Sequence, residues 1–417
     1  MFRKSCESLV ILAGLCLCLL LPTCATQESG PVEATRKAPP GGSRVPEDAL
    51  KKHGLEELWY NPADSSDTAV QLVELSADGL FIATQPVAGR KGRLKLVNRS
   101  NGHPEWIIET DEALKTAPSV YRYPPGTVGK PNEVYLSQLD TVLCIDLKYG
   151  DRLWKQEVPF PISSRVVADD LAYFVGSDNG RAYGLQKKSS IEDWTYRSRS
   201  AIKASPVVGG GAVFVASTDG SVYRFTARTG FVKGSSWEFR TGARVVSDPV
   251  LFSRWVLVGS TDYKLYCLEM QDGAVAWSFP AEGPIEDTPV VFSYRPNQEF
   301  AYCVAVRRTN RAEERTLFSV KMNGKEAGQE AWRRAGVRKI VSMGKSLLYV
   351  ITDPASSEER SLLAVDILTG EEKFRIPLEG FSFVPINTAD FGRNLKERGR
   401  IYLVAEDGTV QVIGERL

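Results

Sequence analysis

The feature that most constrains this chain is the regular recurrence of tryptophan along it. Seven of the eight tryptophans are spaced by roughly 40 to 55 residues, and a phenylalanine takes the next place in the series. These anchors are Trp59, Trp106, Trp154, Trp194, Trp237, Trp277, Trp332 and Phe374. A period of this length is typical of a protein that repeats one small structural unit. We therefore expect an array of similar units rather than a single irregular core.

Each anchor ends a unit with the same order of features. In the unit that ends at Trp237, an apolar run from Val213 is followed by the turn Asp219-Gly220, an alternating run, and the turn Thr229-Gly230. Runs of this kind joined by Asp-Gly turns predict a β-hairpin. A further apolar run, here Ser205–Val208, precedes the hairpin. Four strands per unit is the composition of a propeller blade.

Eight hairpins fit into the chain, and the last of them has no aromatic anchor of its own. They begin near Leu80, Val134, Ala172, Val213, Val256, Ala301, Leu348 and Ile401. Residues 54–61 contain Trp59 but have no hairpin before them, so we expect them to form the outer strand of the last blade. Such a closure removes the free sheet edges of an open array. The predicted fold is an all-β, eight-bladed β-propeller of four-stranded antiparallel blades, closed by an N-terminal strand.

A more specific motif lies in the turns before the anchors. The segments Asp146–Trp154, Thr226–Gly230 and Asp366–Gly370 resemble the L-D-x-x-T-G-x-x-x-W core of pyrroloquinoline-quinone-like (PQQ-like) repeats. Repeats of this family build eight-bladed propellers in quinoprotein dehydrogenases and in BamB-type lipoproteins of the outer-membrane β-barrel assembly machine. The resemblance extends over about residues 54–417. It implies the fold and leaves the function open, because one scaffold hosts many unrelated activities.

The N-terminal segment predicts export. A basic start is followed by the apolar run Leu9–Leu21, which is too short to span a bilayer and is typical of a signal peptide. Two processing sites stay open. One is a lipobox whose Cys24 is lipidated, and the other is cleavage after Ala25.

The expected domain organisation follows from this leader. Residues 1–24 are predicted to be a signal peptide of possible lipoprotein type, residues 25–46 a flexible linker rich in Pro, Gly and Ser, and residues 47–417 the propeller. The predicted location is the periplasm, with anchorage to the outer membrane through a lipid on Cys24.

The inventory of charged and reactive side chains narrows the function. Lys+Arg 52 and Asp+Glu 51 are balanced, so no overall field favours nucleic acid. The two histidines, His53 and His103, lie apart in turns and cannot form a three-histidine zinc site. Aspartates at the hairpin tips are explained by turn chemistry. We therefore predict no catalytic residue, no cofactor and no metal site.

The resemblance to quinoprotein dehydrogenases makes a cofactor site in the central channel an alternative. In those enzymes the quinone lies between a tryptophan and a disulfide of adjacent cysteines, with calcium and a catalytic aspartate. This chain has no Cys-Cys pair. Its body has Cys144, Cys267 and Cys303, an odd number without paired spacing, which we expect to be small buried apolar residues.

The longest predicted hairpin tips should decorate one face of the ring. The tip from Arg307 to Arg315 is strongly charged, and basic residues near the following link add to it. A basic sector of this kind can steer an acidic partner. The alternative is a solvated loop in which Glu and Arg compensate each other. The predicted partner-binding residues are Arg307, Arg308, Arg311, Arg315 and Arg338.

The expected function is that of a non-catalytic, exported interaction scaffold in the cell envelope. A rigid ring with loops on two faces can hold a protein partner without any chemistry. By resemblance to BamB-type proteins, the expected partners are envelope proteins of the β-barrel assembly machinery. Two alternatives are kept: an enzyme with its site in the central channel, and an envelope propeller that binds a small ligand.

Overall fold

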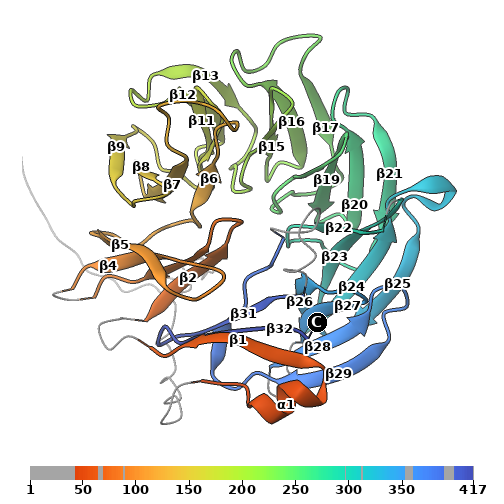
Figure 1. The fold of residues 1–417 in the computed structure, drawn as a ribbon. Helices are drawn as coiled ribbons and strands as arrows, with labels where there is room; N and C mark the ends of the chain where they lie inside the picture. The colour runs from red at the N-terminus through yellow and green to blue at the C-terminus, as the bar shows by residue number, and fades with distance from the viewer. Residues whose placement is uncertain are drawn as a thin grey trace, which may run out of the picture. The chain divides into compact units, whose positions relative to one another are not determined.

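The computed structural model describes residues 43–63, 69–87, 90–295, 297–310, 313–352, 360–388 and 399–416. Within these ranges the chain forms eight four-stranded sheets, each with neighbouring strands antiparallel. The sheets are arranged around a common centre as the blades of a propeller (Figure 1). The predicted fold class is confirmed.

Blades 1 to 7 each follow the chain from the inner to the outer strand, starting with β2-β3-β4-β5, and blade 8 has the order β30-β31-β32-β1. The inner strands are β2 (Val70–Leu75), β6 (Ser119–Tyr121), β10 (Val167–Ala168), β14 (Val207–Gly209), β18 (Val250–Phe252), β22 (Val290–Arg295), β26 (Val337–Met343) and β30 (Phe381–Phe383). The second strands are β3 (Leu80–Thr84), β7 (Glu133–Gln138), β11 (Ala172–Gly176), β15 (Ala212–Ala216), β19 (Trp255–Ser260), β23 (Gln298–Arg308), β27 (Leu347–Thr352) and β31 (Ile401–Ala405).

The two remaining sets complete each blade. The third strands are β4 (Gly92–Val97), β8 (Thr141–Asp146), β12 (Arg181–Gln186), β16 (Ser221–Thr226), β20 (Lys264–Glu269), β24 (Glu313–Lys321), β28 (Ser361–Asp366) and β32 (Val410–Glu415). The outer strands are β5 (Pro104–Thr110), β9 (Arg152–Glu157), β13 (Glu192–Arg197), β17 (Trp237–Arg240), β21 (Val275–Pro280), β25 (Glu330–Ala335), β29 (Glu372–Pro377) and β1 (Leu55–Asn61). The described helices are α1 (Glu47–Lys52) and the 3₁₀ turn η1 (Gly324–Glu326).

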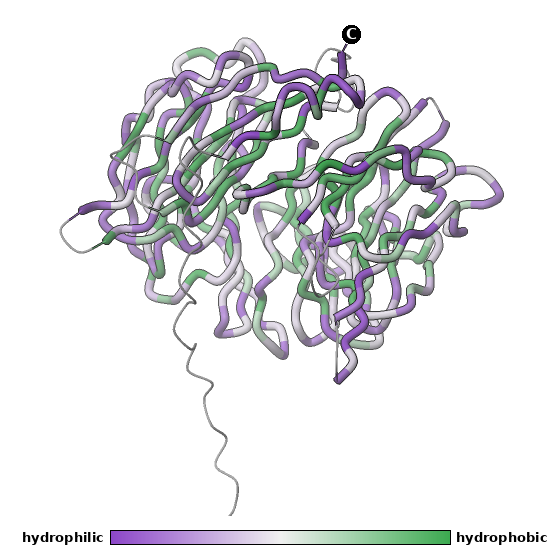
Figure 2. The backbone as a smooth tube through the Cα atoms, turned by 90° about the horizontal axis from the view of Figure 1, so that it is seen from below, coloured by the Kyte–Doolittle hydropathy of each residue, from purple (hydrophilic) through white to green (hydrophobic). Residues whose placement is uncertain are grey.

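The core lies between neighbouring blades. A second strand such as β15 is buried at all five residues, because both faces of its sheet are covered by adjacent sheets. An outer strand such as β9 is mostly exposed and buries its anchor, Trp154. Figure 2 shows the same division, with hydrophobic segments within the blades and hydrophilic segments at many turns.

Each anchor aromatic lies on an outer strand and packs against the next blade. The indole N–H of Trp194 donates to the carbonyl oxygen of Ala227 at 3.0 Å. The same bond joins Trp59 to Arg99, Trp106 to Leu147, Trp237 to Met270 and Trp332 to Ile367. We call the turn that receives the anchor, between the third and outer strands of a blade, the docking turn.

Glycine in the docking turn is required by the close approach of the anchor ring. In blade 4, Gly230 has a φ of 68°, and a Cβ there would lie 2.9 Å from the Trp194 ring. A side chain at this position would therefore be both strained and in collision with the indole. This physical requirement explains the Thr-Gly pair that the sequence repeats.

The ring is closed by the N-terminal strand, as predicted. β1 pairs antiparallel with β32, with Leu55 opposite Glu415 and Asn61 opposite Val410. Phe374 of blade 7 has no tryptophan-type bond and instead stacks on the His53 ring, with centroids 4.5 Å apart. His53 is therefore the docking surface for the eighth anchor.

The packed body begins before residue 47. Val45 is buried, its N–H donates to the Gln411 side chain at 2.8 Å, and its carbonyl oxygen accepts from the same amide at 3.0 Å. Ser43 is buried as well. Residues 43–46, expected to end the linker, thus belong to blade 8, because the buried Gln411 needs their backbone as its hydrogen-bond partner.

Two faces of the ring carry different connections. The tip face carries the tips between second and third strands together with the links between blades. The turn face carries the docking turns and the loops between inner and second strands. Among the described residues, none of the helices has the length and apolar character needed to cross a bilayer.

Candidate functional site

The predicted basic sector lies on the tip face, and much of its charge is compensated within the ring. Arg308 donates to both carboxylate oxygens of Glu286 at 2.8 and 2.7 Å and also contacts Glu313. These bonds lower the pKa of Glu286. Arg315 is paired with Glu313 at 2.7 Å and Asp287 at 3.1 Å. A two-pronged arginine–carboxylate pair is directional, so these side chains are positioned rather than free.

The remaining predicted site residues are distributed differently. Arg307 and Arg338 are exposed and lie on β23 and β26, in neighbouring blades. Arg311 and Cys24 lie outside the described residues. The structure therefore brings four of the five predicted arginines to adjacent blades, and two of these four form part of a mixed-charge network.

The central channel is lined by charged side chains from the inner strands and the segments before them. Arg165 of blade 3 donates to Glu74 of blade 1 at 2.8 Å. Asp248 accepts from the Ser205 N–H at 2.6 Å, and burial raises the pKa of its carboxyl group. Burial also lowers the pKa of Lys339 to about 8. These charged groups on and before the inner strands therefore come from several blades.

The described cysteines do not form the disulfide that a quinone site of the dehydrogenase type contains. The cofactor needs a disulfide between adjacent cysteines, whereas Cys144, Cys267 and Cys303 are free, buried and located in three different blades. Burial raises the pKa of each thiol, which keeps it protonated and unreactive. Within the described ranges, no group of three or more His, Cys, Asp or Glu could hold a metal ion.

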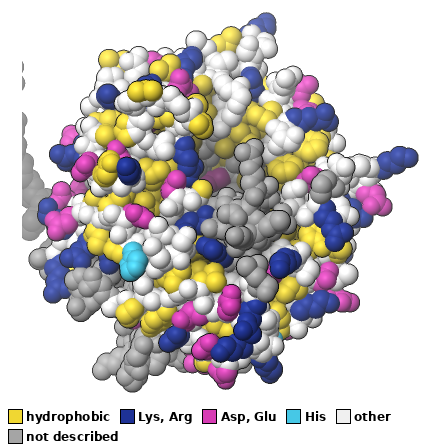
Figure 3. Space-filling view, viewed as in Figure 1, with side chains coloured by type: hydrophobic (Ala, Val, Ile, Leu, Met, Phe, Trp, Pro, Cys, Tyr) yellow, Lys and Arg dark blue, Asp and Glu magenta, His cyan; other side chains and the backbone are white. Residues whose placement is uncertain are grey.

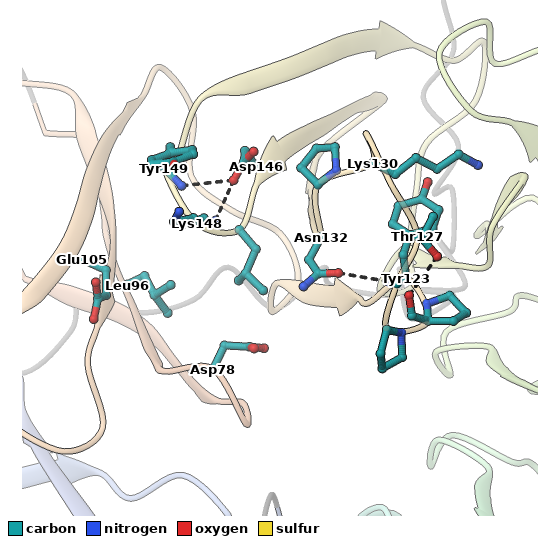
Figure 4. A pocket seen from close by; sticks show the side chains of 15 residues that line it. Asp78, Leu96, Glu105, Tyr123, Thr127, Lys130, Asn132, Asp146, Lys148 and Tyr149 are labelled. Atoms are coloured by element: carbon teal, nitrogen blue, oxygen red, sulfur yellow. Dashed lines mark hydrogen bonds between the residues drawn. The ribbon is translucent and has the colours of Figure 1, made fainter.

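A groove on the turn face offers a more open site (Figure 4). It lies between blades 1 and 2, and its volume is about 720 Å³. One wall is the docking turn of blade 2, with Lys148 and Tyr149, and the other is the loop from Tyr123 to Asn132. The volume is in the range of ligand- and peptide-binding sites. Figure 3 shows that cationic, anionic and hydrophobic side chains are intermixed on the face turned to the viewer.

The loop wall is held by local hydrogen bonds. The Tyr123 N–H donates to the Asn132 side chain at 3.0 Å, across the base of the loop. The Thr127 N–H and hydroxyl both donate to the Pro124 carbonyl oxygen, at 3.1 and 2.8 Å. Two adjacent prolines further restrict the backbone. The loop therefore has a defined shape.

A buried ion pair behind the loop fixes the Tyr123 ring. Lys187 of blade 3 lies 2.6 Å from Glu133 of blade 2, and the two side chains are only 9% and 8% exposed. The Tyr123 hydroxyl contacts both, at 3.1 Å each. The Lys187 ammonium also lies over the rings of Tyr121 and Tyr123, at 4.3 and 4.9 Å. Burial lowers the pKa of Lys187, against the opposing effect of Glu133.

The sequence analysis did not single out this groove or the ion pair beside its loop. The available signal was Lys187 itself, which occupies the docking-turn place held by Leu147 in blade 2, Ala227 in blade 4 and Met270 in blade 5. A lysine in an otherwise apolar slot indicates a buried partner. The sequence did not indicate that this partner is Glu133, in another blade.

The fold defines the class: the described residues form an eight-bladed β-propeller, and its docking turns carry a motif that resembles PQQ-like repeats. Residues 138–244 match the family model described as outer membrane protein assembly factor BamB. A similar protein is the outer membrane protein assembly factor BamB of Burkholderia pseudomallei, 31% identical over 111 residues. That match covers 26% of this chain and 28% of the relative's length.

Solved structures with a similar fold include proteins of different function. A BamB structure from Moraxella catarrhalis has a TM-score of 0.61 and 13% identity, over 86% of this chain and 99% of that one. A quinohemoprotein alcohol dehydrogenase from Pseudomonas putida has a TM-score of 0.61 and 10% identity, over 87% of this chain and 76% of that one. The computationally designed Ika8 protein has a TM-score of 0.57 and 13% identity, over 86% and 99%. At these identities the likeness shows the fold alone.

Proposed function

We propose that this protein is an exported, non-catalytic interaction scaffold of the cell envelope that binds components of outer-membrane protein assembly. The observation that carries this proposal is the match of residues 138–244 to the BamB model. The leader and Cys24 support export and anchorage to the outer membrane. Lipid on Cys24 would keep the ring at the periplasmic surface of that membrane, where such partners work.

The geometry supports a binding role more than a reaction. The loops on both faces are held by internal hydrogen bonds and ion pairs, so they present fixed surfaces for a partner. The basic sector with Arg307, Arg308, Arg311, Arg315 and Arg338 remains a proposed partner-binding surface on the tip face. Its acidic neighbours imply a partner with charges of both signs.

The direct test is affinity purification of the tagged full chain from its own envelope, with mass spectrometry of Cys24 and of the copurified proteins. We expect outer-membrane assembly components and a diacylated Cys24. A Cys24→Ala variant serves as the matched control and should lose membrane anchorage while keeping the folded ring. Recovery of the chain without such components would contradict the proposal.

A quinoprotein-like enzyme is the second candidate, because a dehydrogenase shares the fold and the channel contains enclosed carboxylates such as Asp248. The test is binding of pyrroloquinoline quinone with calcium, followed by quinone absorbance, and reduction of a dye by alcohols. We expect neither binding nor dye reduction, since the described cysteines are separate, buried core residues and cannot form the disulfide of adjacent cysteines that would hold the quinone.

A further inference from the structure

The groove between blades 1 and 2 combines two chemical features that point to one kind of ligand. Two lysines line the groove, Lys130 on the loop wall and Lys148 on the docking turn, and Asn132 lies between them in the view of Figure 4. Apolar surface is provided by Pro124, Pro125 and other side chains of the same walls. Neither feature is used by the packing of the ring.

The carboxylates of the groove already have partners. Asp78 is bound by the guanidinium of Arg122, and the exposed Glu105 accepts from the Asn98 side-chain amide at 2.6 Å. Asp146 accepts from the N–H groups of Lys148 and Tyr149 at 2.7 and 3.1 Å, which is turn capping. Their acceptor capacity is largely consumed inside the protein. A cationic ligand would therefore have to displace existing bonds.

The two lysines have no such partner. Both are exposed, and neither forms an ion pair with a described residue. The Lys148 ammonium lies 4.7 Å from the centroid of the Tyr149 ring, and the Lys130 ammonium lies 5.0 Å from that of Tyr123. An aromatic face steadies an ammonium group without neutralising it. The groove therefore offers two separated cationic groups that no described carboxylate pairs with.

Apolar side chains beside the lysines are unusually exposed. Tyr149, in the docking turn of blade 2, lines the groove and is 61% exposed, and Val128, on the loop between Thr127 and Lys130, is 94% exposed. Exposed apolar groups gathered at a groove mark an interaction site more often than isolated ones do. A ligand that covers them needs apolar groups of its own between its charges.

The loop wall of the groove is preorganised by hydrogen bonds within the protein. The Tyr123 hydroxyl is hydrogen-bonded to Glu133 and Lys187, and Asn132 closes the loop base. A wall that is already ordered does not lose conformational freedom when it binds, which favours affinity.

We infer that this groove docks an extended acidic peptide in which carboxylate side chains alternate with apolar ones. Carboxylates would pair with Lys130 and Lys148, while the apolar side chains would cover Tyr149 and the Pro124-Pro125 edge. The inference rests on the proposed scaffold function and names the chemistry of one partner segment.

The test is fluorescence anisotropy of a short labelled peptide of alternating Glu and Leu, titrated with the full chain. A second peptide with Gln in place of Glu isolates the charge. We expect saturable binding of the Glu peptide that weakens with salt, and at least about tenfold weaker binding of the Gln peptide, because both ion pairs would be lost.

Variants locate the site. The double variant Lys130→Glu/Lys148→Glu should lower the affinity by about tenfold or more, and Tyr149→Ala by about threefold, since charge reversal adds repulsion to the loss of attraction. The charge-matched control is Lys233→Glu/Lys264→Glu, two exposed lysines of blades 4 and 5, which should bind as the natural chain does. Circular dichroism melting verifies that each variant is folded.

Equal binding by the double variant and its control would overturn the inference, as would equal binding of the Glu and Gln peptides. The envelope purification separates this failure from failure of the proposed function. A double variant that loses the peptide but keeps the assembly components leaves both intact, with a different surface holding those components. A natural chain that recovers the components but never binds the peptide refutes the groove inference alone.

Discussion

The docking turns of blades 3 and 4 perform the same task with different residues. In blade 4, residues 226–230 receive Trp194 with a glycine under the ring and a carbonyl oxygen for the indole N–H. In blade 3, residues 186–190 receive Trp154 with Lys187 where blade 4 has Ala227, and Ser190 where it has Gly230. Ser190 adopts a φ of 53°, and the Trp154 indole N–H has no acceptor among the described residues.

This difference shows that one position of the repeat can serve another purpose: Lys187 occupies the docking-turn position that Ala227 occupies in blade 4. The backbone of both turns is the same, since the N–H of Ser190 donates to Gln186 as that of Gly230 donates to Thr226. In blade 3 the buried slot instead directs an ammonium toward Glu133 and the tyrosines of blade 2. The contact between Trp194 and the docking turn of blade 4, the regular seam, stabilises the ring. The contact between Trp154 and the docking turn of blade 3, the irregular seam, also orders the wall of a surface groove.

The largest effect is expected from removing the anchors. Trp194→Ala should lower the free energy of unfolding by about 3–5 kcal/mol, because a large buried side chain leaves a cavity. Trp154→Ala should cost about 1 kcal/mol less, because its indole bond is already missing. Equilibrium denaturation of both variants measures this. Equal losses would mean that the two seams are energetically alike.

The next effect comes from the buried pair. Lys187→Met leaves the Glu133 carboxylate enclosed without its partner, so we expect a loss of about 3 kcal/mol. The double variant Lys187→Met/Glu133→Leu should recover most of it, since no buried charge remains. The matched change in the regular seam, Ala227→Met, should not respond to alteration of Glu133. Denaturation of the set forms a double-mutant cycle; additive losses would show that the pair is not coupled.

Substitution at the glycine position should lower stability clearly in the docking turn of blade 4 and change it little in that of blade 3. Gly230→Ala is expected to cost about 2 kcal/mol, from a left-handed backbone and the collision with Trp194. Ser190→Gly should change stability by less than about 1 kcal/mol, because relief of the backbone is offset by loss of the Tyr173–Ser190 hydrogen bond. Melting temperatures of both variants are sufficient, and a strongly destabilised Ser190→Gly would contradict this balance.

The smallest effect is expected for Lys339, which, unlike Lys187, has no carboxylate partner among the described residues. Lys339 has no ion pair with a described residue, and its pKa is lowered to about 8 from 10.5. The unfolded chain then binds more protons between these values, so stability should rise with pH across that window. Lys339→Met should stabilise the protein at neutral pH by less than about 1 kcal/mol, because channel water screens the charge. This gain should vanish toward pH 10.5, and a constant difference would contradict the assignment.

The fold was predictable because its signals are local and repeated. Trp194 together with Thr229-Gly230 indicates one blade, and the same pattern recurs along the chain. The ring and its closure by residues 54–61 could therefore be predicted from the spacing of the pattern. The groove was not predictable in this way. It needs Asp78, Lys148 and Tyr123 to meet across two blades, and the pairing of Lys187 with Glu133 joins residues 54 positions apart. The compensation of Arg308 by Glu286 likewise depends on how a tip packs on a link.

The pairing of β1 with β32 in blade 8 determines when the ring can close during folding. The hydrogen bonds between Val45 and Gln411 join residues separated by 366 positions, and β1 precedes all the other strands in synthesis yet pairs with the last one. Contacts of such long range form late and slowly in folding. The nascent chain therefore retains an unpaired β1 until β32 has left the ribosome, so the ring closes only after β32 has been synthesised.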